Sequence, residues 1–249
     1  MSKNINNYSP YSPSRIQTYF NCPKQFQFRY IDGKRASFQS IEAFLGSVIH
    51  SVLEWAAKDI ANQNEDKVRE KYSNEWKRLI NQNTIKIIRN NLTEVHYREW
   101  GDSLLATFFQ RPDPFPGETL KLEYSVQVKL DSNHILRGII DRLSLEDGEL
   151  VITDYKSGSR KYGEESHLRQ LKAYSLAIFK SFPNYNIIRI RIDYLVTGEK
   201  IEERISRKDS ADTIRRDLLT KINEIETAKE FPPTFSRLCE WCGYKTLCD

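Results

Sequence analysis

Two carboxylates and a lysine are the residues of this chain best suited to carry out chemistry. Asp154 and Lys156 lie two positions apart in a run of strand-forming residues, so their side chains should share one face. Asp141 lies in the preceding strand-like run, which we expect to be the neighbouring strand. Carboxylates bind hard divalent cations, and an adjacent ammonium group can orient or deprotonate a water molecule. The combination indicates phosphodiester hydrolysis, although an Asp-x-Lys pair alone is more often a surface ion pair.

The cysteines form a second set of residues with possible chemistry. Cys22 lies near the start of the chain, and the other three follow the pattern Cys239-x2-Cys242-x5-Cys248 at its end. Disulfide bonds are not expected in a chain that opens without an export signal. Four thiolates can hold either zinc or an iron–sulfur cluster, and the spacing does not choose between them. Unrelated buried thiols are the remaining alternative.

Length and composition limit the class of protein. The 249 residues carry a formal net charge of +4, and 29% of them are charged. This length can bury the core of one large domain. The absence of a long apolar run and of a signal peptide predicts a soluble, cytoplasmic protein without a membrane partner.

The basic excess is concentrated at the N-terminus. Residues 1–40 contain one acid, Asp32, and six basic residues: Lys3, Arg15, Lys24, Arg29, Lys34 and Arg35. Among them lie Tyr19, Phe20, Phe26, Phe28 and Tyr30. Basic and aromatic side chains together can bind the backbone and bases of a single strand, so this region is a candidate DNA-binding surface. Alternatively, the aromatic side chains pack inside the protein and the charges form a solvated face.

Hydrophobic periodicity predicts which elements position these residues. The predicted helices are a short one beginning near Ser12 or Ser14 and bounded by Cys22-Pro23, one over 41–56, a polar helical stretch over 66–110 broken near Asn90-Asn91, and two more over 163–182 and 209–229. The predicted strands are 120–130, 135–145, 149–156, 187–196 and 200–206.

These elements predict an α/β (α+β) fold, with a small mixed sheet flanked by helices. Asp147-Gly148 between two strands is a hairpin signal, so the first three strands should form an antiparallel meander. The proline-rich segment 111–117 must end the polar helices. We expect a single domain over 1–249, in which about 60–115 is a helical insertion.

Several short motifs occur in an order that resembles one nuclease family. They are Gly46-x3-His50, Gly138-x2-Asp141, Asp154-x-Lys156 and Gln170-x3-Tyr174, flanked by Ser14-Arg15-Ile16-Gln17-Thr18-Tyr19-x2-Cys22-Pro23 and by the three C-terminal cysteines. This order resembles the RecB-like branch of the PD-(D/E)XK nuclease superfamily, with its restriction-endonuclease-like core. Within that branch it is similar to the iron–sulfur nucleases: the small CRISPR-associated nuclease family, the AddB nuclease domain and related eukaryotic exonucleases. The resemblance covers the chain outside 60–115.

The resemblance implies a role for each matched residue. His50, Asp141, Asp154 and the backbone carbonyl of Tyr155 would hold Mg²⁺ or Mn²⁺, and Lys156 would position the attacking water. Gln170 and Tyr174 would support Lys156 or contact the DNA backbone. Glu123, on the strand before Asp141, is a candidate additional acidic ligand, although an acid on a solvated strand face is the more common situation.

The resemblance also implies what the cysteines do. Cys22, Cys239, Cys242 and Cys248 would hold a 4Fe-4S cluster, with zinc as the alternative, and the tail 231–249 would thereby be joined to the Cys22 region.

The expected function is a metal-dependent DNA nuclease, an exonuclease acting on single-stranded DNA ends. The alternative is a catalytically silent nucleic-acid-binding or complex-assembly module of the same fold. CRISPR adaptation, recombinational DNA repair and phage DNA processing are all compatible with this chemistry, and helicase, CRISPR or repair proteins are candidate partners.

Overall fold

The computed structural model describes residues 10–82, 84–158 and 163–248 of the chain. Lys3, one of the N-terminal basic residues considered above, and Ser159, in the turn after Lys156, therefore lie outside the described residues. None of the helices in the described ranges combines the length and the apolar character needed to cross a membrane.

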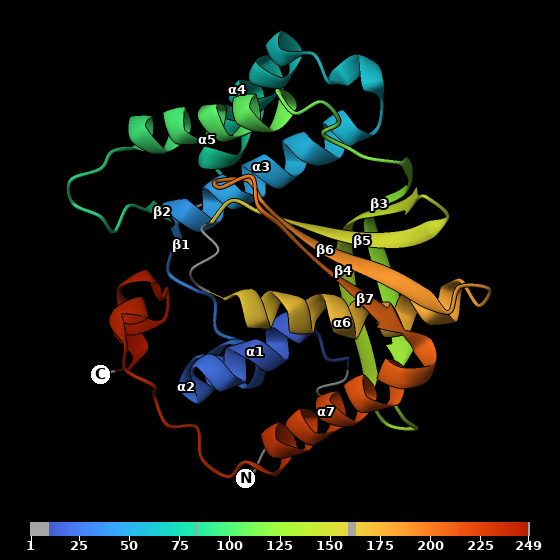
Figure 1. Ribbon diagram of the computed structural model, residues 1–249. Helices are drawn as coiled ribbons and strands as arrows, with labels where there is room; N and C mark the ends of the chain where they lie inside the picture. Colours follow the sequence, from blue (N-terminus) through green and yellow to red (C-terminus); the bar gives the residue numbers. More distant parts are fainter. Residues whose placement is uncertain (1–9, 83, 159–162, 249) are drawn as a thin grey trace.

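A five-stranded mixed sheet forms the centre of the fold (Figure 1). Its strands, in the order in which they lie side by side, are β3 (Glu118–Lys129), β4 (Ile135–Glu146), β5 (Glu149–Lys156), β6 (Ile187–Tyr194) and β7 (Lys200–Ser206). β3, β4 and β5 form the predicted antiparallel meander, β6 pairs parallel to β5, and β7 pairs antiparallel to β6. At the β4–β5 hairpin, Asp147 and Gly148 have positive φ values of 51° and 82°, as this type of tight turn requires. The expected fold class is confirmed.

One side of the sheet is covered by helices from both ends of the chain. These are α1 (Pro13–Asn21), α6 (Glu164–Ser181) and α7 (Arg207–Thr227), with α2 (Pro23–Phe26) and a π-helical turn (Gln27–Ile31) following α1. α1 begins at the predicted Ser12, whose side chain accepts a hydrogen bond from the Arg15 N–H. α6 connects β5 to β6, and its apolar side packs with Ile152, Ile190 and Ile192 in the main hydrophobic core.

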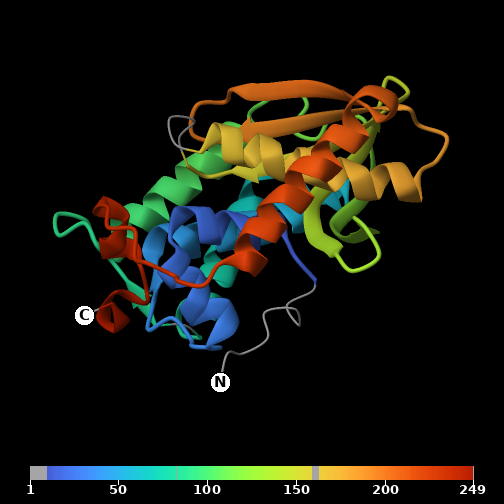
Figure 2. The same ribbon diagram turned by 90° about the horizontal axis from the view of Figure 1, so that it is seen from below.

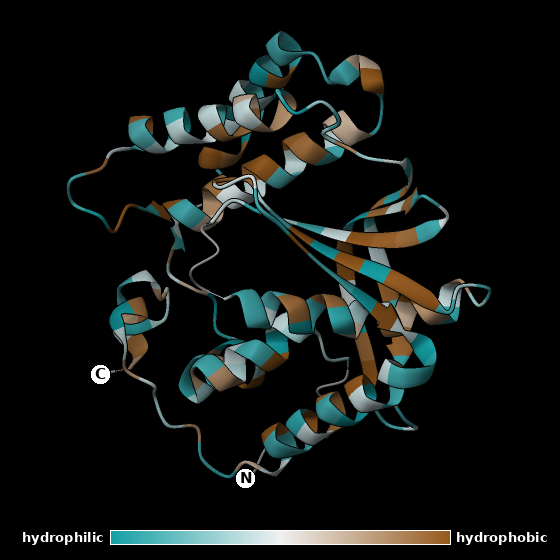
Figure 3. Cartoon of the chain, in the orientation of Figure 1, coloured by the Kyte–Doolittle hydropathy of each residue, from teal (hydrophilic) through white to brown (hydrophobic). Residues whose placement is uncertain are grey.

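The other side carries a second hydrophobic core. It is built around α3 (Ile41–Ala57), with α4 (Glu65–Ile80) and α5 (Glu94–Phe109) packed against it and a 3₁₀ turn (Ile60–Asn62) between α3 and α4. Tyr72, Trp76 and Tyr97 of the polar helical stretch are buried here, so these helices contribute to a core of their own. Figure 3 shows the contrast between the largely apolar α3 and the largely hydrophilic α7.

Two polar contacts tie these helices to the sheet. Arg111, which follows α5, donates to both oxygens of Asp193 on β6, at 3.0 and 2.8 Å. Arg142 on β4 is fully buried, and its guanidinium binds the backbone carbonyls of Phe115, Pro116 and Gly117 just before β3. The proline-rich segment thus ends the helices as predicted. A short parallel pair between β1 (Gln39–Ser40) and β2 (Ile85–Lys86) was not predicted, because two-residue strands have no periodicity.

The C-terminal tail lies beside the N-terminal helices in both views (Figures 1 and 2). It contains two 3₁₀ turns, Arg237–Trp241 and Lys245–Leu247. The Ser37 N–H and hydroxyl both donate to the Gly243 carbonyl at 2.8 Å, and the Tyr244 hydroxyl donates to the Lys34 carbonyl at 3.2 Å. The tail is therefore attached to the segment that leads into α3.

Most of the N-terminal aromatic side chains are part of the core. Tyr19, Phe26 and Phe28 are buried, whereas Phe20 is 40% exposed. The Arg15 guanidinium lies over the rings of Tyr11, Phe26 and Tyr30, and the ammonium groups of Lys24 and Lys34 lie over Phe28. Of the two alternatives for Tyr19, Phe26 and Phe28, packing inside the protein is therefore the one that the structure shows.

Candidate active site

The site lies where β4 and β5 part. Their regular pairing ends at Arg142 and Thr153. Beyond this pair, the Tyr155 N–H, two residues after Thr153, donates to Oδ2 of Asp141, the residue before Arg142, over 2.9 Å. This hydrogen bond holds a carboxylate at the opening between the strands, where a polar ligand can approach it.

α3 brings an imidazole to this opening. His50 Nδ1 lies 3.3 Å from Asp141 Oδ2. The helix approaches the end of β5 closely at Gly46, where an added Cβ would lie 3.3 Å from Ser157 Oγ. Burial by itself would lower the pKa of His50, but the charge and hydrogen bond of Asp141 raise it to about 9. Without a metal ion, His50 and Asp141 therefore form an ion pair at neutral pH.

Glu123 completes a compact group of ligands. One ligand atom each from His50, Glu123 and Asp141 lies within 4.8 Å of the others. Burial and the Asp141 carboxylate raise the pKa of Glu123. An imidazole and two carboxylates form a donor set that suits a divalent cation, so the residues present fit the metal that the sequence implies.

The backbone at Glu123 is unusual for a strand. The pairs Leu122–Arg142 and Tyr124–Ile140 flank it, so it lies across from Asp141, yet its φ is +44°. A left-handed conformation costs a non-glycine residue about 1–2 kcal/mol. Such strain commonly occurs at functional sites, where it sets the direction of a side chain.

Asp154 and Lys156 share a face, as their spacing predicts. Lys156 Nζ lies 2.7 Å from Asp154 Oδ2, and Asp154 is 5% exposed. Burial raises the pKa of Asp154, and the ammonium group of Lys156 opposes this shift. Asp154 is not part of the 4.8 Å group, although its charge affects His50 and Asp141. Its role as a metal ligand and that of the Tyr155 carbonyl remain predictions.

Gln170 and Tyr174 lie on the side of α6 that faces the site. Gln170 Nε2 donates to the Tyr174 hydroxyl over 3.3 Å. Tyr174 is 5% exposed and lies against β4 at Gly138, where an added Cβ would come within 2.1 Å of its ring. Burial raises the pKa of Tyr174 to about 12, with a contribution from Asp154. This geometry favours structural support over DNA contact for Tyr174.

His167 is a residue near the site that our sequence reasoning missed. Its Nδ1 lies 3.3 Å from the Tyr194 hydroxyl. Burial and the positive charge of Lys156 lower its pKa to about 4, so the imidazole is neutral. Helical spacing in the sequence could have identified it, because positions 167, 170 and 174 lie on one side of α6.

The four cysteines line a single cavity of about 190 Å³ between the end of α1 and the tail. The Thr234 N–H points at Cys22 Sγ over 3.5 Å. Burial raises the pKa of Cys242 and of Cys248, and the neighbouring thiols add to both shifts. No three of the sulfur atoms, all of which the structure describes, lie within 4.8 Å of one another.

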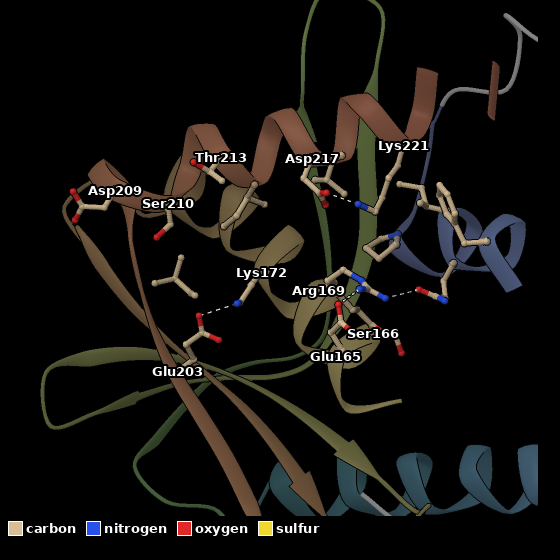
Figure 4. A pocket seen from close by; sticks show the side chains of 18 residues that line it. Glu165, Ser166, Arg169, Lys172, Glu203, Asp209, Ser210, Thr213, Asp217 and Lys221 are labelled. Carbon is tan, nitrogen blue, oxygen red and sulfur yellow. Dashed lines mark hydrogen bonds and ion pairs between the residues drawn. The ribbon is translucent and has the colours of Figure 1, made fainter. Parts of the chain in front are cut away.

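A larger cavity, of about 650 Å³, lies between α1, α6, β7 and α7 (Figure 4). Gln170 reaches its edge, but the candidate metal ligands do not line it. Six of its seven charged side chains form the pairs Lys172–Glu203, Arg169–Glu165 and Lys221–Asp217, and Asp209 accepts a hydrogen bond from the Ser206 hydroxyl. This cavity is therefore separate from the ligand group.

Comparison with known proteins now decides the family. The sequence model of the PD-(D/E)XK nuclease superfamily matches residues 10–249. The chain belongs to this superfamily. A crystal structure from Eubacterium rectale, named "Putative exonuclease", has the same fold, with a TM-score of 0.52 and 9% identity over 94% of this chain and 90% of that one. The crystal structure of SSO0001 also matches, with a TM-score of 0.38 and 11% identity over 100% of this chain and 87% of that one.

Proposed function

We propose that this PD-(D/E)XK superfamily member is a divalent-metal-dependent deoxyribonuclease that hydrolyses phosphodiester bonds. The observation that carries the proposal is the group formed by His50, Glu123 and Asp141, with the Asp154–Lys156 pair beside it. When bound, Mg²⁺ or Mn²⁺ would activate water and neutralise charge on the phosphate. A binding module would need the fold but not these five side chains.

The protein groups have distinct parts in this reaction. Water adds to phosphorus, and the bond from phosphorus to the leaving sugar oxygen breaks, which yields one phosphate end and one hydroxyl end. The Lys156 ammonium orients the water and the non-bridging oxygens. His50, Glu123, Asp141 and Asp154 supply the ligand atoms. Gln170 and Tyr174 keep α6 at a fixed distance from β4.

We further propose that the substrate is DNA and that cleavage proceeds from single-stranded ends. The support is the motif order that resembles the RecB-like and AddB-like nucleases, together with the name of the Eubacterium rectale protein. Partners of the helicase, CRISPR or repair classes, and a cytoplasmic location, belong to the same proposal. Within it, residues 1–249 act as one domain, with 60–115 as an insertion.

The test is cleavage of end-labelled single-stranded DNA, double-stranded DNA and RNA, with Mg²⁺, Mn²⁺ or chelator. We expect metal-dependent shortening of the single-stranded DNA from its ends. Lys156→Ala should reduce the rate by roughly 100-fold or more and leave DNA binding intact, because removing a positioned proton-transfer or orienting group typically costs this much. Lys180→Ala, an exposed lysine at the end of α6, is the control. A Lys156→Ala protein that cuts at the wild-type rate would refute the catalytic assignment.

We also propose that the four cysteines hold a 4Fe-4S cluster, which would place the chain in the iron–sulfur branch. Their convergence on one cavity supports a shared ligand. Four thiolates can also hold zinc, so metal analysis must distinguish the two ligands. Anaerobically purified protein should absorb near ~400 nm and contain iron and sulfide, whereas a colourless zinc protein would contradict the proposal.

A further inference from the structure

One face of the β3–β4 hairpin is exposed and leads away from the candidate metal ligands. The register pairs Ser125 with Ile139, Gln127 with Arg137 and Lys129 with Ile135. Direct cross-strand partners in an antiparallel pair have their side chains on the same face. The intervening side chains Val126, Val128, Leu136 and Ile140 are buried on the opposite face. We call the exposed side chains of Ser125, Gln127, Lys129, Arg137 and Ile139 the hairpin track.

The track begins next to the metal ligands. Glu123 and Asp141 lie two positions before Ser125 and two positions after Ile139, respectively. At ~3.4 Å per residue, Arg137 lies ~14 Å from Asp141 along the strand. A strand in a duplex rises by the same ~3.4 Å per nucleotide, so this distance spans at most roughly four nucleotides, and fewer of an extended single strand. A strand held at Asp141 could therefore extend along the hairpin.

The charge of the track complements a polyanion. From 123 to 129 on β3 and from 135 to 141 on β4, the only acids are Glu123 and Asp141 themselves. Within the described part of the chain, Lys129 and Arg137 take part in no ion pair, whereas Arg189, Arg191 and Arg204 on the strands β6 and β7 pair with glutamates. Ser125 and Gln127 add neutral donors. Ile139 is 52% exposed and offers an apolar contact beside Asp141.

We propose that the hairpin track binds the phosphate backbone of the substrate on one side of the cleaved bond. Arg137 and Lys129 contact phosphates, Ser125 and Gln127 donate hydrogen bonds, and Ile139 packs on the sugar or base nearest to Asp141. This assignment rests on the proposed nuclease function and names its substrate-binding surface.

The test compares two charge-matched double variants. Arg137→Gln with Lys129→Gln removes the cations of the track, and Lys180→Gln with Lys208→Gln removes two exposed lysines of α6 and α7 as the control. Binding of a fluorescent single-stranded oligonucleotide is measured in chelator over a range of salt concentrations, so that cleavage is not required. We expect the track variant to bind at least about tenfold more weakly at low salt. Its log–log salt slope should be smaller by ~1.4, which is ~0.7 for each lost phosphate contact.

A small diester substrate separates this proposal from the proposed function. Bis(p-nitrophenyl) phosphate reports metal-dependent hydrolysis but is too short to reach Arg137. The track variant should hydrolyse it at the wild-type rate and show a raised KM only on long DNA. If the wild-type protein hydrolyses neither bis(p-nitrophenyl) phosphate nor long DNA, the nuclease function itself is refuted.

Other outcomes would refute the binding role of the hairpin track and leave the nuclease function intact. Active wild-type protein with equal salt slopes for the two double variants would show that the face is merely solvated. A loss of binding that instead follows Lys34→Gln with Arg35→Gln would place the binding surface at the basic N-terminal region.

Discussion

At the scale of residues, Glu123 combines a strained backbone conformation with a place among the candidate metal ligands. Its left-handed conformation lies within a strand, and its carboxylate is directed at His50 and Asp141. In the metal-free protein the two carboxylates repel each other, which is one reason why the pKa of Glu123 is raised. Glu123 is therefore unfavourable for folding and, in our proposal, useful for binding the metal ion.

Glu123→Asn should separate these two effects. Asparagine tolerates the left-handed conformation and lacks the charge, so the free energy of unfolding of the metal-free protein should be unchanged or rise by about 1 kcal/mol. Metal affinity should fall by about tenfold or more, since even loss of an outer-shell partner has this effect. Urea denaturation and metal titration measure the two quantities.

Asp147→Asn is the matched control for this substitution. Asp147 has a similar φ of 51°, but it lies in the β4–β5 turn away from the ligands. Its substitution should leave metal affinity unchanged. A large loss of stability in Glu123→Asn with unchanged metal binding would mean that Glu123 has a structural role only.

At the scale of elements, the site depends on the distance between α6 and β4. Gly138 allows the Tyr174 ring to touch the strand, because a Cβ there would lie 2.1 Å from the ring. Gly138→Ala should lower the free energy of unfolding by about 1–3 kcal/mol, the usual cost of overpacking. Because Gln170 and Tyr174 would also be displaced, cleavage should slow. Gly158→Ala is the control, since its added Cβ would have no neighbour within 4 Å among the residues that the structure describes; equal melting temperatures of the two variants would contradict the prediction.

The β3–β4 turn is joined to α7 by a pH-sensitive contact. His134 Nδ1 lies 2.8 Å from Asp131, its Nε2 lies 3.1 Å from Glu226, and Tyr11 donates to the same glutamate. Burial by itself would lower the pKa of His134, but hydrogen bonds to both carboxylates raise it above its usual value. The protonated form is therefore stabilised in the folded protein.

His134→Gln should destabilise the protein in a pH-dependent way. Because the folded pKa is raised, the stabilisation is complete below the unfolded pKa of ~6.5 and is lost as the pH rises through the folded value. We expect a loss of about 1–2 kcal/mol between pH 5 and 6 that shrinks at high pH, measured by urea denaturation at each pH. A difference that grows with pH would have the wrong sign.

At the scale of the whole molecule, the tail connects the cysteine cavity to the active site. It binds the segment 34–37, which leads directly into α3, the helix that carries His50. A cluster that joins Cys22 to the tail would close almost the entire chain into one loop. Such closure stabilises a folded protein because it restricts the unfolded chain.

Cys22→Ser should therefore bleach the protein, lower its melting temperature and reduce cleavage indirectly through α3. Asn21→Ser, at the exposed neighbouring position, is the control and should leave all three properties unchanged. Iron content, thermal denaturation and the cleavage rate provide the measurements. Full iron content and full stability in Cys22→Ser would exclude this cysteine as a ligand.

Local patterns in the sequence were sufficient to predict the strands, most of the helices and the meander. Alternation along β5 also places Asp154 and Lys156 on one face, because side-chain direction in a strand depends only on neighbouring residues. The polar composition of 66–110 was less informative, since a few aromatic residues among many charges are enough to form the second core.

Local patterns do not show which distant residues meet, and only the tertiary structure placed Glu123 with His50 and Asp141. It also brings His50 to Asp141 and Cys22 to the cavity of the tail cysteines, which the family resemblance implied but no local pattern could show. It also buried Tyr19, Phe26 and Phe28, which composition alone left open. The physical reason is that local backbone geometry sets the direction of a side chain, whereas its partners depend on how helices and strands far apart in the chain pack together.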